Sequence, residues 1–291
     1  MARVHPLLQR EESIFTPPKV AGQHILVTGS NGSIGSKVST RLSDLGAIVH
    51  GFDVTDGFDV TDLETCMEIV HKYKPTAIIH LAAEKYATSA EAEPYKVVNL
   101  NAHGTHYLCS TAKKFGVKTL VAATTCKSIE PETVYGASKL ISDRIVLNHG
   151  FTVGRFFNVV ESEGNVFEIW TDRIKNKQEL YVTTCKRYFI SVDEAVGFII
   201  HLLSLKPGRY APFPGEIVEM KDMARRFAPG YPMKVFPPRR GDRVEEPLIG
   251  KHEKYILKDR LMIIDNPHDH PAGSAEKGML PDRNKKSTPH S

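Results

Sequence analysis

Two patterns in this chain combine residue types that could carry out chemistry. Tyr135 and Lys139 stand four residues apart, and about a hundred residues earlier a glycine-rich turn contains Gly29, Gly32 and Gly35. In this order the two patterns are typical of enzymes that exchange hydride between a nicotinamide dinucleotide and an alcohol or ketone. The turn would hold the pyrophosphate, and the Tyr/Lys pair would move a proton. Each pattern alone is common by chance, so the elements around them decide the interpretation.

The glycine turn stands in the context that a dinucleotide site requires. The apolar run 24–28 predicts a buried parallel strand that feeds directly into the turn, and 33–46 predicts a helix that begins there. Glycines let the backbone approach a pyrophosphate, whose charge then lies at the helix N-terminus. The predicted pyrophosphate site comprises Gly29, Gly32, Ser33, Ile34 and Gly35.

Asp53 follows the second predicted strand, 47–52. A carboxylate at this place accepts hydrogen bonds from the adenosine ribose and repels a 2′-phosphate, which favours NAD over NADP as the cofactor. NADP is kept as the alternative. The competing interpretation is an exposed turn acid, because Asp56 and Asp59 are close by.

The segment Tyr135-Gly-Ala-Ser-Lys139 lies in a predicted helix, 132–149, which places both side chains on one face. A lysine ammonium beside a phenol lowers the pKa of the phenol, so that the oxygen can accept a proton from a substrate hydroxyl. The alternative is a surface tyrosine beside a solvated lysine.

Strands and helices alternate through the first half of the chain. The predicted strands are 24–28, 47–52, 76–82, 118–123 and 151–156, and the predicted helices between them are 33–46, 62–73, 91–115 and 132–149. Alternation of this kind predicts an α/β fold, a Rossmann-like doubly wound parallel sheet. After Asn158 short segments rich in Gly and Pro predict a small C-terminal substrate-binding lobe.

This pattern divides the chain into four parts. We expect an N-terminal arm over the core at 1–22, an NAD-binding Rossmann domain at 23–160, and a mainly substrate-binding lobe at 161–260. Within that lobe, 187–205 should return to the Rossmann core. The polar stretch 261–291 is expected to be a mobile tail.

Composition excludes several other classes of protein. The chain has 291 residues, of which 41% are hydrophobic and 25% charged, and its net charge of +4 is too mild to indicate nucleic acid. No apolar run has the 18 or so residues of a membrane span, and the first residues lack a signal-peptide core, so we expect a cytoplasmic protein without a membrane partner. The scattered Cys66, Cys109, Cys126 and Cys185 indicate neither a disulfide framework nor a metal site.

At residues 23–250 the chain resembles the extended short-chain dehydrogenase/reductase family. The recurring blocks that carry the resemblance are His80-Leu-Ala-Ala83, Asn101-Ala-His-Gly-Thr105, Arg155-Phe-Phe-Asn158 and Arg187-Tyr-Phe-Ile-Ser-Val-Asp193. Within the family the chain is similar to the UDP-N-acetylglucosamine 4,6-dehydratase and polysaccharide-biosynthesis (CapD-like) branch. The segments that carry this narrower resemblance are Leu7-Leu-Gln-Arg-Glu11, Ala82-Ala-Glu-Lys85, Thr125-Cys-Lys127 and Arg239-Arg-Gly-Asp-Arg-Val-Glu-Glu246.

The resemblance implies a reaction and the residues that perform it. In those relatives the cofactor oxidises the sugar at C4, a base removes the C5 proton, an acid protonates the departing C6 hydroxyl, and hydride returns to C6. Carried over, Tyr135 is the base at C4 and Lys127 the base at C5, while Cys126 takes the place of the acid in a Thr-Asp-Lys motif. Lys127 would have to be neutral to act as a base, which requires burial or a nearby cation.

The resemblance also implies the remaining contacts. The implied catalytic group includes Thr125 and Lys139, a UDP-sugar is the implied substrate, and a homo-oligomer is the implied assembly. The further cofactor contacts are Asp59, Val60, Ala82 and Lys139. The substrate contacts are Lys85, Asn158, Arg187, Arg239, Arg240 and Glu246.

Several departures from the pattern keep alternatives open. Cys126 replaces an aspartate, Glu161 stands where relatives usually have glycine, and the loop 53–59 is short. If Cys126 is an inert buried residue, the enzyme would be a nucleotide-sugar 4-epimerase or a reductase. A 5,6-dehydratase that leaves an exocyclic alkene is a further alternative. A non-catalytic dinucleotide sensor is disfavoured, because such proteins commonly lack the Tyr/Lys pair.

Overall fold

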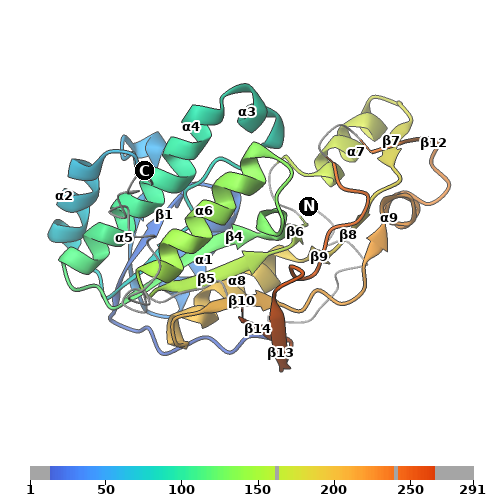
Figure 1. The fold of residues 1–291 in the computed structure, drawn as a ribbon. Coiled ribbons are helices and arrows are strands. Elements are labelled where there is room, and N and C mark those ends of the chain that lie inside the picture. The colour runs from blue at the N-terminus through green and yellow to red at the C-terminus, as the bar shows by residue number, and fades with distance from the viewer. Residues whose placement is uncertain (1–13, 161–163, 239–241, 266–291) are drawn as a thin grey trace, which may run out of the picture.

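An eight-stranded sheet forms the centre of the fold (Figure 1). The structure is a computed structural model that describes residues 14–160, 164–238 and 242–265. The strand order is β13-β14-β10-β5-β4-β3-β1-β2, and the six strands from β10 to β2 run parallel. The strands are β1 (His24–Thr28), β2 (Ile48–Phe52), β3 (Ala77–His80), β4 (Thr119–Thr125), β5 (Thr152–Phe156), β10 (Arg209–Pro212), β13 (Lys254–Lys258) and β14 (Leu261–Asp265). This confirms the predicted α/β class and its parallel sheet.

The strand order reverses direction next to β1. The chain passes from β1 outward to β2 and then returns to the other side of β1 to form β3. A crevice opens at the carboxyl ends of the strands wherever the order of a parallel sheet reverses in this way, and ligands bind there. The glycine turn follows β1 directly, so the topology places it at this crevice.

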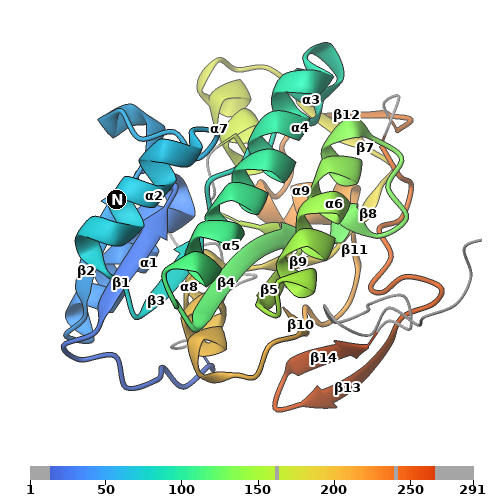
Figure 2. The same ribbon diagram turned by 60° about the vertical axis from the view of Figure 1, so that its left-hand side comes forward.

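Helices cover both faces of the sheet (Figure 2). On one face lie α2 (Leu63–Tyr73), α5 (Thr105–Lys114) and α6 (Val134–Asn148), and on the other lie α1 (Ser33–Asp44) and α8 (Val192–His201). The central strands are therefore buried on both sides, which explains why they read as continuous apolar runs rather than as alternating ones. All four residues of β3 and all five of β5 are buried.

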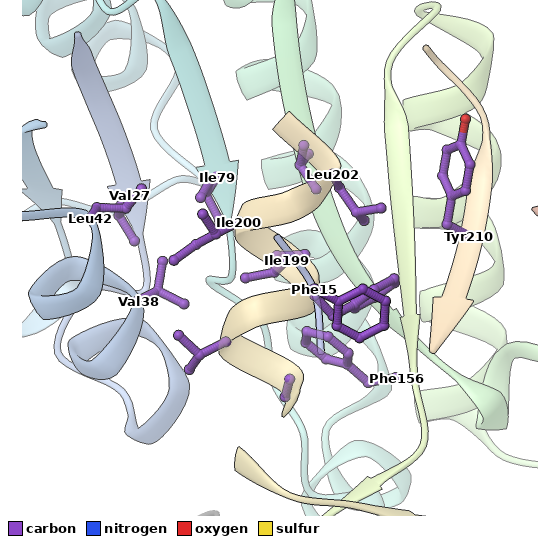
Figure 3. Close-up of a cluster of buried hydrophobic side chains, with 14 of the residues drawn as sticks. Phe15, Val27, Val38, Leu42, Ile79, Phe156, Ile199, Ile200, Leu202 and Tyr210 are labelled. Atoms are coloured by element: carbon purple, nitrogen blue, oxygen red, sulfur yellow. The ribbon is translucent and has the colours of Figure 1, made fainter. Parts of the chain in front are cut away.

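The core beneath α8 also includes part of the N-terminal arm. Figure 3 shows Val27 of β1 and Val38 of α1 on one side of α8, where Ile200 faces them, with Phe15 on the other side of the same helix. Phe15 is buried, and its ring centroid lies 5.5 Å from that of Phe198. This end of the arm therefore packs against α8. Residues 1–13, including the predicted Leu7–Glu11 motif, lie outside the described residues.

The long helix predicted for 91–115 is divided into four pieces. The pieces are α3 (Ala87–Ala92), α4 (Pro94–Val98), a π-helical segment (Asn99–Gly104) and α5. Pro94 explains the first break, because a residue that precedes proline is disfavoured in the helical region, and Glu93 has φ −129° and ψ 62°. Short π-helical segments are frequent at functional sites, and this one contains Asn101.

The lobe after Asn158 is built from short paired strands and two helices. Strand β6 (Asn158–Val159) pairs with β9 (Phe189–Ile190), β7 (Leu180–Thr183) with β12 (Met233–Phe236), and β8 (Lys186–Arg187) with β11 (Val218–Glu219). Helices α7 (Val166–Lys175) and α9 (Met220–Phe227) close a separate apolar cluster around Trp170. The expected boundaries need one correction. Residues 261–265 form β14 inside the main sheet rather than the start of a tail, and β10 and β13 also join that sheet.

A buried ionic network fixes the loop before β13 to the sheet. Arg155 of β5 donates two hydrogen bonds to Glu253, at 2.7 and 2.8 Å, while Arg209 of β10 pairs with Asp143 of α6. All four side chains are at least 94% buried. Although burial alone would raise the pKa of Glu253, its hydrogen bonds from Arg155 lower that pKa to about 2.

This network predicts an acid-sensitive contribution to stability. Because the pKa of Glu253 is depressed in the folded protein, its contribution is complete above the unfolded value near 4.5 and is lost as the pH falls towards about 2. Glu253→Gln should lower the free energy of unfolding at neutral pH by about 3–5 kcal/mol, since it removes the carboxylate nearest to the buried Arg155 and leaves only the more distant Asp143. Denaturant unfolding of both proteins between neutral pH and about pH 3 checks this. A difference that does not shrink on acidification would contradict it.

Candidate functional site

The glycine turn brings three segments into close contact. Gly29 has φ +68°, and a Cβ placed on it would lie 2.7 Å from the backbone nitrogen of Ala82. A Cβ on Gly35 would collide with the carbonyl oxygen of Gly29. Larger residues would therefore force the turn open. Gly32 caps α1 without a side-chain hydrogen bond to the first turn, so the cap leaves the N-terminal N–H groups of α1 available to a ligand.

Asp53 is buried at the end of β2 and is tied to the turn. One carboxylate oxygen accepts from the backbone N–H of Asn31 at 3.0 Å, and the other accepts from the N–H and the hydroxyl of Thr55. Burial would raise the pKa of Asp53, but these hydrogen bonds hold the pKa below its ordinary value. Asp53 is thus a fixed negative charge rather than the exposed turn acid of the alternative interpretation.

A cavity of about 610 Å³ lies at the crevice. All ten residues predicted to contact the cofactor line it: Gly29, Gly32, Ser33, Ile34, Gly35, Asp53, Asp59, Val60, Ala82 and Lys139. The backbone-lined turn suits a pyrophosphate, and Asp53 suits a ribose. The structure therefore fits a dinucleotide at this place.

Tyr135 and Lys139 line the same cavity, as their spacing predicts. Lys139 is buried and donates from Nζ to the carbonyl oxygen of Ala123 at 2.7 Å. Burial lowers the pKa of Lys139 to about 8, although Asp143 opposes the shift. The pKa of Tyr135 is raised, chiefly by burial, and the cation that opposes this rise is Lys127. The expectation that Lys139 also acts on the phenol stays a prediction.

A second cavity, of about 380 Å³, adjoins the first on the side of the lobe. The two cavities share six lining residues: Ser33, Ile34, Lys85, Thr124, Tyr135 and Phe156. Thr125 and Lys127 line only the second one. A ligand in the second cavity would therefore meet Tyr135 and Lys127 together, next to whatever occupies the first.

The close approach of Tyr135 and Lys127 depends on the start of α6. Thr133 caps the helix by accepting from the N–H of Gly136 at 3.1 Å. A Cβ on Gly136 would collide with the carbonyl oxygen of Lys127, so only glycine lets the helix lie this close to the turn 126–128. Thr125 caps that turn by accepting from the N–H of Lys127, and its hydroxyl also bonds to Tyr135.

Lys127 is an ion-paired ammonium in this structure. Its Nζ lies 3.1 Å from a carboxylate oxygen of Glu246 and donates to Oδ1 of Asn158 at 3.0 Å, while 40% of the side chain stays exposed. Burial is the largest single effect and would lower the pKa of Lys127, but Glu246, together with Cys126 and Tyr135, raises it overall. The neutral lysine that the C5-base role requires is therefore not the form that this environment favours.

Cys126 lies away from both cavities. Its side chain is fully buried, packs with Ile129 and Phe157, and donates from Sγ to Glu246 at 3.4 Å. Burial, reinforced by Glu246, raises the pKa of the thiol to about 12. The predicted role of Cys126 as proton donor to the C6 oxygen does not fit this placement, because the thiol faces a carboxylate inside the protein.

The predicted substrate contacts fall into three groups. Lys85, Asn158 and Arg187 line the second cavity. Glu246 lines neither cavity and is instead 3% exposed beneath Lys127 and Arg187. Arg239 and Arg240 lie outside the described residues, as does Glu161.

Sequence reasoning missed the apolar wall of the second cavity. It consists mainly of Tyr86, Phe157, Val166, Phe167, Phe189 and Met220. Most of these residues come from the lobe, where the periodicity is too short to assign faces. It also gave no role to Asn101, which exchanges hydrogen bonds with the backbone of Glu84 and donates to Ser138 one turn after Tyr135. The recurring block that begins at Asn101 was the available signal for it.

Two features are absent from the part of the chain that the structure describes: a cluster of metal-ligand side chains and a helix of membrane-spanning character. Within residues 14–160, 164–238 and 242–265, no group of three or more His, Cys, Asp or Glu side chains is arranged to hold a metal ion. Across those same ranges, no helix combines the length and the apolar character needed to cross a bilayer.

Known structures share this fold. The chain superimposes on Pen from Bacillus thuringiensis with a TM-score of 0.76 at 20% identity, covering 85% of this chain and 88% of that one. It superimposes on the UDP-glucose 4-epimerase of Thermus thermophilus, solved in complex with NAD, with a TM-score of 0.68 at 23% identity, covering 77% and 89%. At these identities the likeness shows the fold.

Sequence relatives add the family. The probable polysaccharide biosynthesis protein EpsC of Bacillus subtilis is 28% identical over 81% of this chain, which spans only 46% of EpsC. The inverting UDP-N-acetylglucosamine 4,6-dehydratase of Campylobacter jejuni is 27% identical over 89% of this chain and 90% of its own length. The family described as polysaccharide biosynthesis protein matches residues 52–265. That match begins at the last residue of β2, includes most of the residues that line the two cavities and ends at the last residue of β14, so the chain belongs to the polysaccharide biosynthesis protein family.

Proposed function

We propose that this protein is an NAD-dependent nucleotide-sugar dehydratase that acts on UDP-N-acetylglucosamine or a related UDP-sugar. The observation that carries the proposal is that Tyr135 and Lys127, two groups that can transfer protons, face one cavity beside the dinucleotide site. Oxidation at C4 requires one such group, and elimination across C5 and C6 requires a second. The dehydratase relative from Campylobacter jejuni supports the same assignment.

The residues divide the work of binding and proton transfer. When bound, a nicotinamide would take hydride from C4 of the sugar and later return hydride to C6. The glycine turn and Asp53 would hold the dinucleotide, with Lys139 beside it. Tyr135 would take the proton of the C4 hydroxyl, helped by the charge of Lys127. Lys85 and Arg187 would bind the negative diphosphate of the sugar nucleotide.

Incubation with UDP-N-acetylglucosamine and NAD tests the function. Mass spectrometry should show the loss of one water from the sugar nucleotide, and NMR should locate a C4 ketone and a C6 methyl group. An exocyclic alkene in place of the methyl group would identify a 5,6-dehydratase. A product of unchanged mass would instead identify an epimerase, and no conversion of several UDP-sugars would reject the proposal.

A nucleotide-sugar 4-epimerase is the second candidate. The buried position of Cys126 removes the acid expected from the resemblance, and an epimerase needs no acid at C6. UDP-glucose 4-epimerases are also among the relatives, for example that of Rickettsia canadensis at 24% identity over 70% of this chain. The mass of the product separates the two candidates.

The cofactor preference should depend on Asp53. We expect the protein to bind NAD more tightly than NADP, because the fixed carboxylate repels a 2′-phosphate. Asp53→Ala should reduce the difference between the two affinities. Calorimetric titration with each dinucleotide measures both affinities. Asp56→Ala is the matched control, since Asp56 accepts from Asn31 in the same loop but does not line the cavity. Equal affinities in the unchanged protein would contradict the assignment to NAD.

A further inference from the structure

Four residues form an ion cluster beneath the second cavity: Lys127, Asn158, Arg187 and Glu246. The first three line the cavity, whereas Glu246 lies behind them and is 3% exposed. The segment that contains Glu246 is far from the other three in sequence. A buried carboxylate that touches three polar residues of the cavity lining, yet does not itself reach the cavity, suggests a role exerted through its neighbours.

We infer that Glu246 is the positioning residue that holds Lys127 as an ammonium at the sugar, so that Lys127 enters the elimination as the proton donor. This inference rests on the proposed dehydratase function. It replaces both roles implied by the resemblance, the neutral base at position 127 and the acid at position 126.

The geometry of the ion cluster leaves Glu246 little freedom. One carboxylate oxygen lies 3.1 Å from Nζ of Lys127 and 3.3 Å from Nε of Arg187. The other accepts from Nδ2 of Asn158 at 2.7 Å and from Sγ of Cys126 at 3.4 Å. Asn158 in turn accepts from Lys127 at 3.0 Å. Both oxygens are thus engaged, and Lys127 is held from two sides.

The charges around Lys127 favour its protonated form. Glu246 is the nearest carboxylate, and its own pKa stays lowered, although burial would raise it, because Lys127 and Arg187 stabilise its charge. The other titratable groups that face Lys127 are Cys126 and Tyr135, which stay neutral because burial raises the pKa of each. The charge of Glu84, in the loop after β3, also raises the pKa of Tyr135. Lys85, the next residue, lines the second cavity together with Lys127.

A single lysine can complete the elimination from this starting state. One Nζ–H proton passes to the departing C6 oxygen as the C6–O bond breaks. In the same step the lone pair left on Nζ takes the C5 proton, so that the C5–H electron pair forms the C5=C6 bond and the ammonium is restored. Water leaves, and no further acid is required. Cys126 serves this scheme only by donating to Glu246.

The pH dependence of Glu246→Gln tests the inference. The amide keeps the shape of the side chain but removes the charge that raises the pKa of Lys127, so Lys127 should deprotonate at lower pH. If the ammonium is the reacting form, kcat/KM of the variant should fall by about 10-fold or more between about pH 7 and about pH 10, while the unchanged protein falls much less. If the neutral amine is the reacting form, the variant should become relatively faster at alkaline pH, which would overturn the inference.

Two further variants separate charge from structure. Glu245→Gln makes the same chemical change at the preceding residue, which is exposed and pairs with Lys186. It should leave the pH dependence of kcat/KM unchanged. Glu246→Asp retains the charge and should restore most of the profile of the unchanged protein. Loss of activity in Glu246→Gln without a change in the shape of the profile would show a merely structural role and would contradict the inference.

A titration without substrate distinguishes failure of this inference from failure of the proposed function. Nitrogen NMR of lysine-labelled protein follows Nζ of Lys127, assigned by its absence in Lys127→Ala. The titration midpoint should be lower in Glu246→Gln than in the unchanged protein. An unshifted midpoint overturns the inference even if the protein dehydrates UDP-sugars. A shifted midpoint in a protein that converts no UDP-sugar would support the effect of Glu246 on the pKa of Lys127 but reject the proposed dehydratase function.

Discussion

Replacement of Tyr135 by phenylalanine should lower turnover of the UDP-sugar by about 10²–10⁴, the loss typical of a missing general base. The ring keeps its packing between the two cavities, so binding of the dinucleotide and of the sugar nucleotide should change little. Only the oxygen that accepts the C4 proton is lost. Single-turnover measurement of C4 oxidation, with calorimetry for both ligands, checks the result.

Two outcomes would contradict this prediction. Unchanged turnover would mean that another group takes the proton. Equal losses of turnover and of affinity would mean that the hydroxyl serves binding rather than proton transfer. Thr125→Val provides a comparison, since it removes the hydroxyl that bonds to Tyr135 while leaving the phenol in place. Its effect should be smaller than that of Tyr135→Phe.

Replacement of Lys127 by alanine should abolish the elimination, whereas the first oxidation should become slower but still occur, because Tyr135 loses the charge that lowers its pKa. We expect water loss and solvent deuterium incorporation at C5 to fall together by about 10²–10⁴, because one side chain handles both protons. The C4 ketone of the unreacted sugar should accumulate instead. Mass spectrometry of the sugar nucleotide after reaction in deuterated water measures both quantities.

Cys126→Ser is the matched control for Lys127→Ala. The thiol lies next to Lys127 in the chain but does not line the cavity, so its replacement should change the elimination by less than about 10-fold. A loss as large as that of Lys127→Ala would restore Cys126 as the acid. Full dehydratase activity in Lys127→Ala would remove Lys127 from the mechanism.

The sequence predicts the Rossmann half of the fold well, because its signals are local. The run 24–28 is apolar and ends at a glycine, and β1 has the same limits. Asp62 was placed at the start of a helix, and it caps α2 by accepting from the N–H of Glu64. The residues predicted to contact the cofactor line one cavity for a related reason. Most of them lie shortly after a strand, and parallel strands end at one edge of a sheet.

The lobe and the charge state of Lys127 could not be predicted in this way. Strands β6, β8, β9 and β11 have two residues each, too few to show a period. The partner that sets the pKa of Lys127 lies about 120 residues away, in a segment with no regular pattern. The motif around Cys126 indicated a reactive pair, but burial and direction of a side chain depend on packing that no local pattern encodes.

The position of Glu246 late in the chain affects the order in which a newly synthesised protein gains its two activities, dinucleotide binding and water elimination. Everything that contacts the dinucleotide cavity precedes Phe157, so that half of the site can assemble early in synthesis. Glu246, the Glu253 anchor and strand β14 come last, and β14 enters the sheet beside β10 only after the lobe has been made. The second proton-transfer group thus gains its buried carboxylate partner only when the last part of the chain docks. A ribosome-bound chain that ends before residue 242 should hold the dinucleotide and yet be unable to eliminate water.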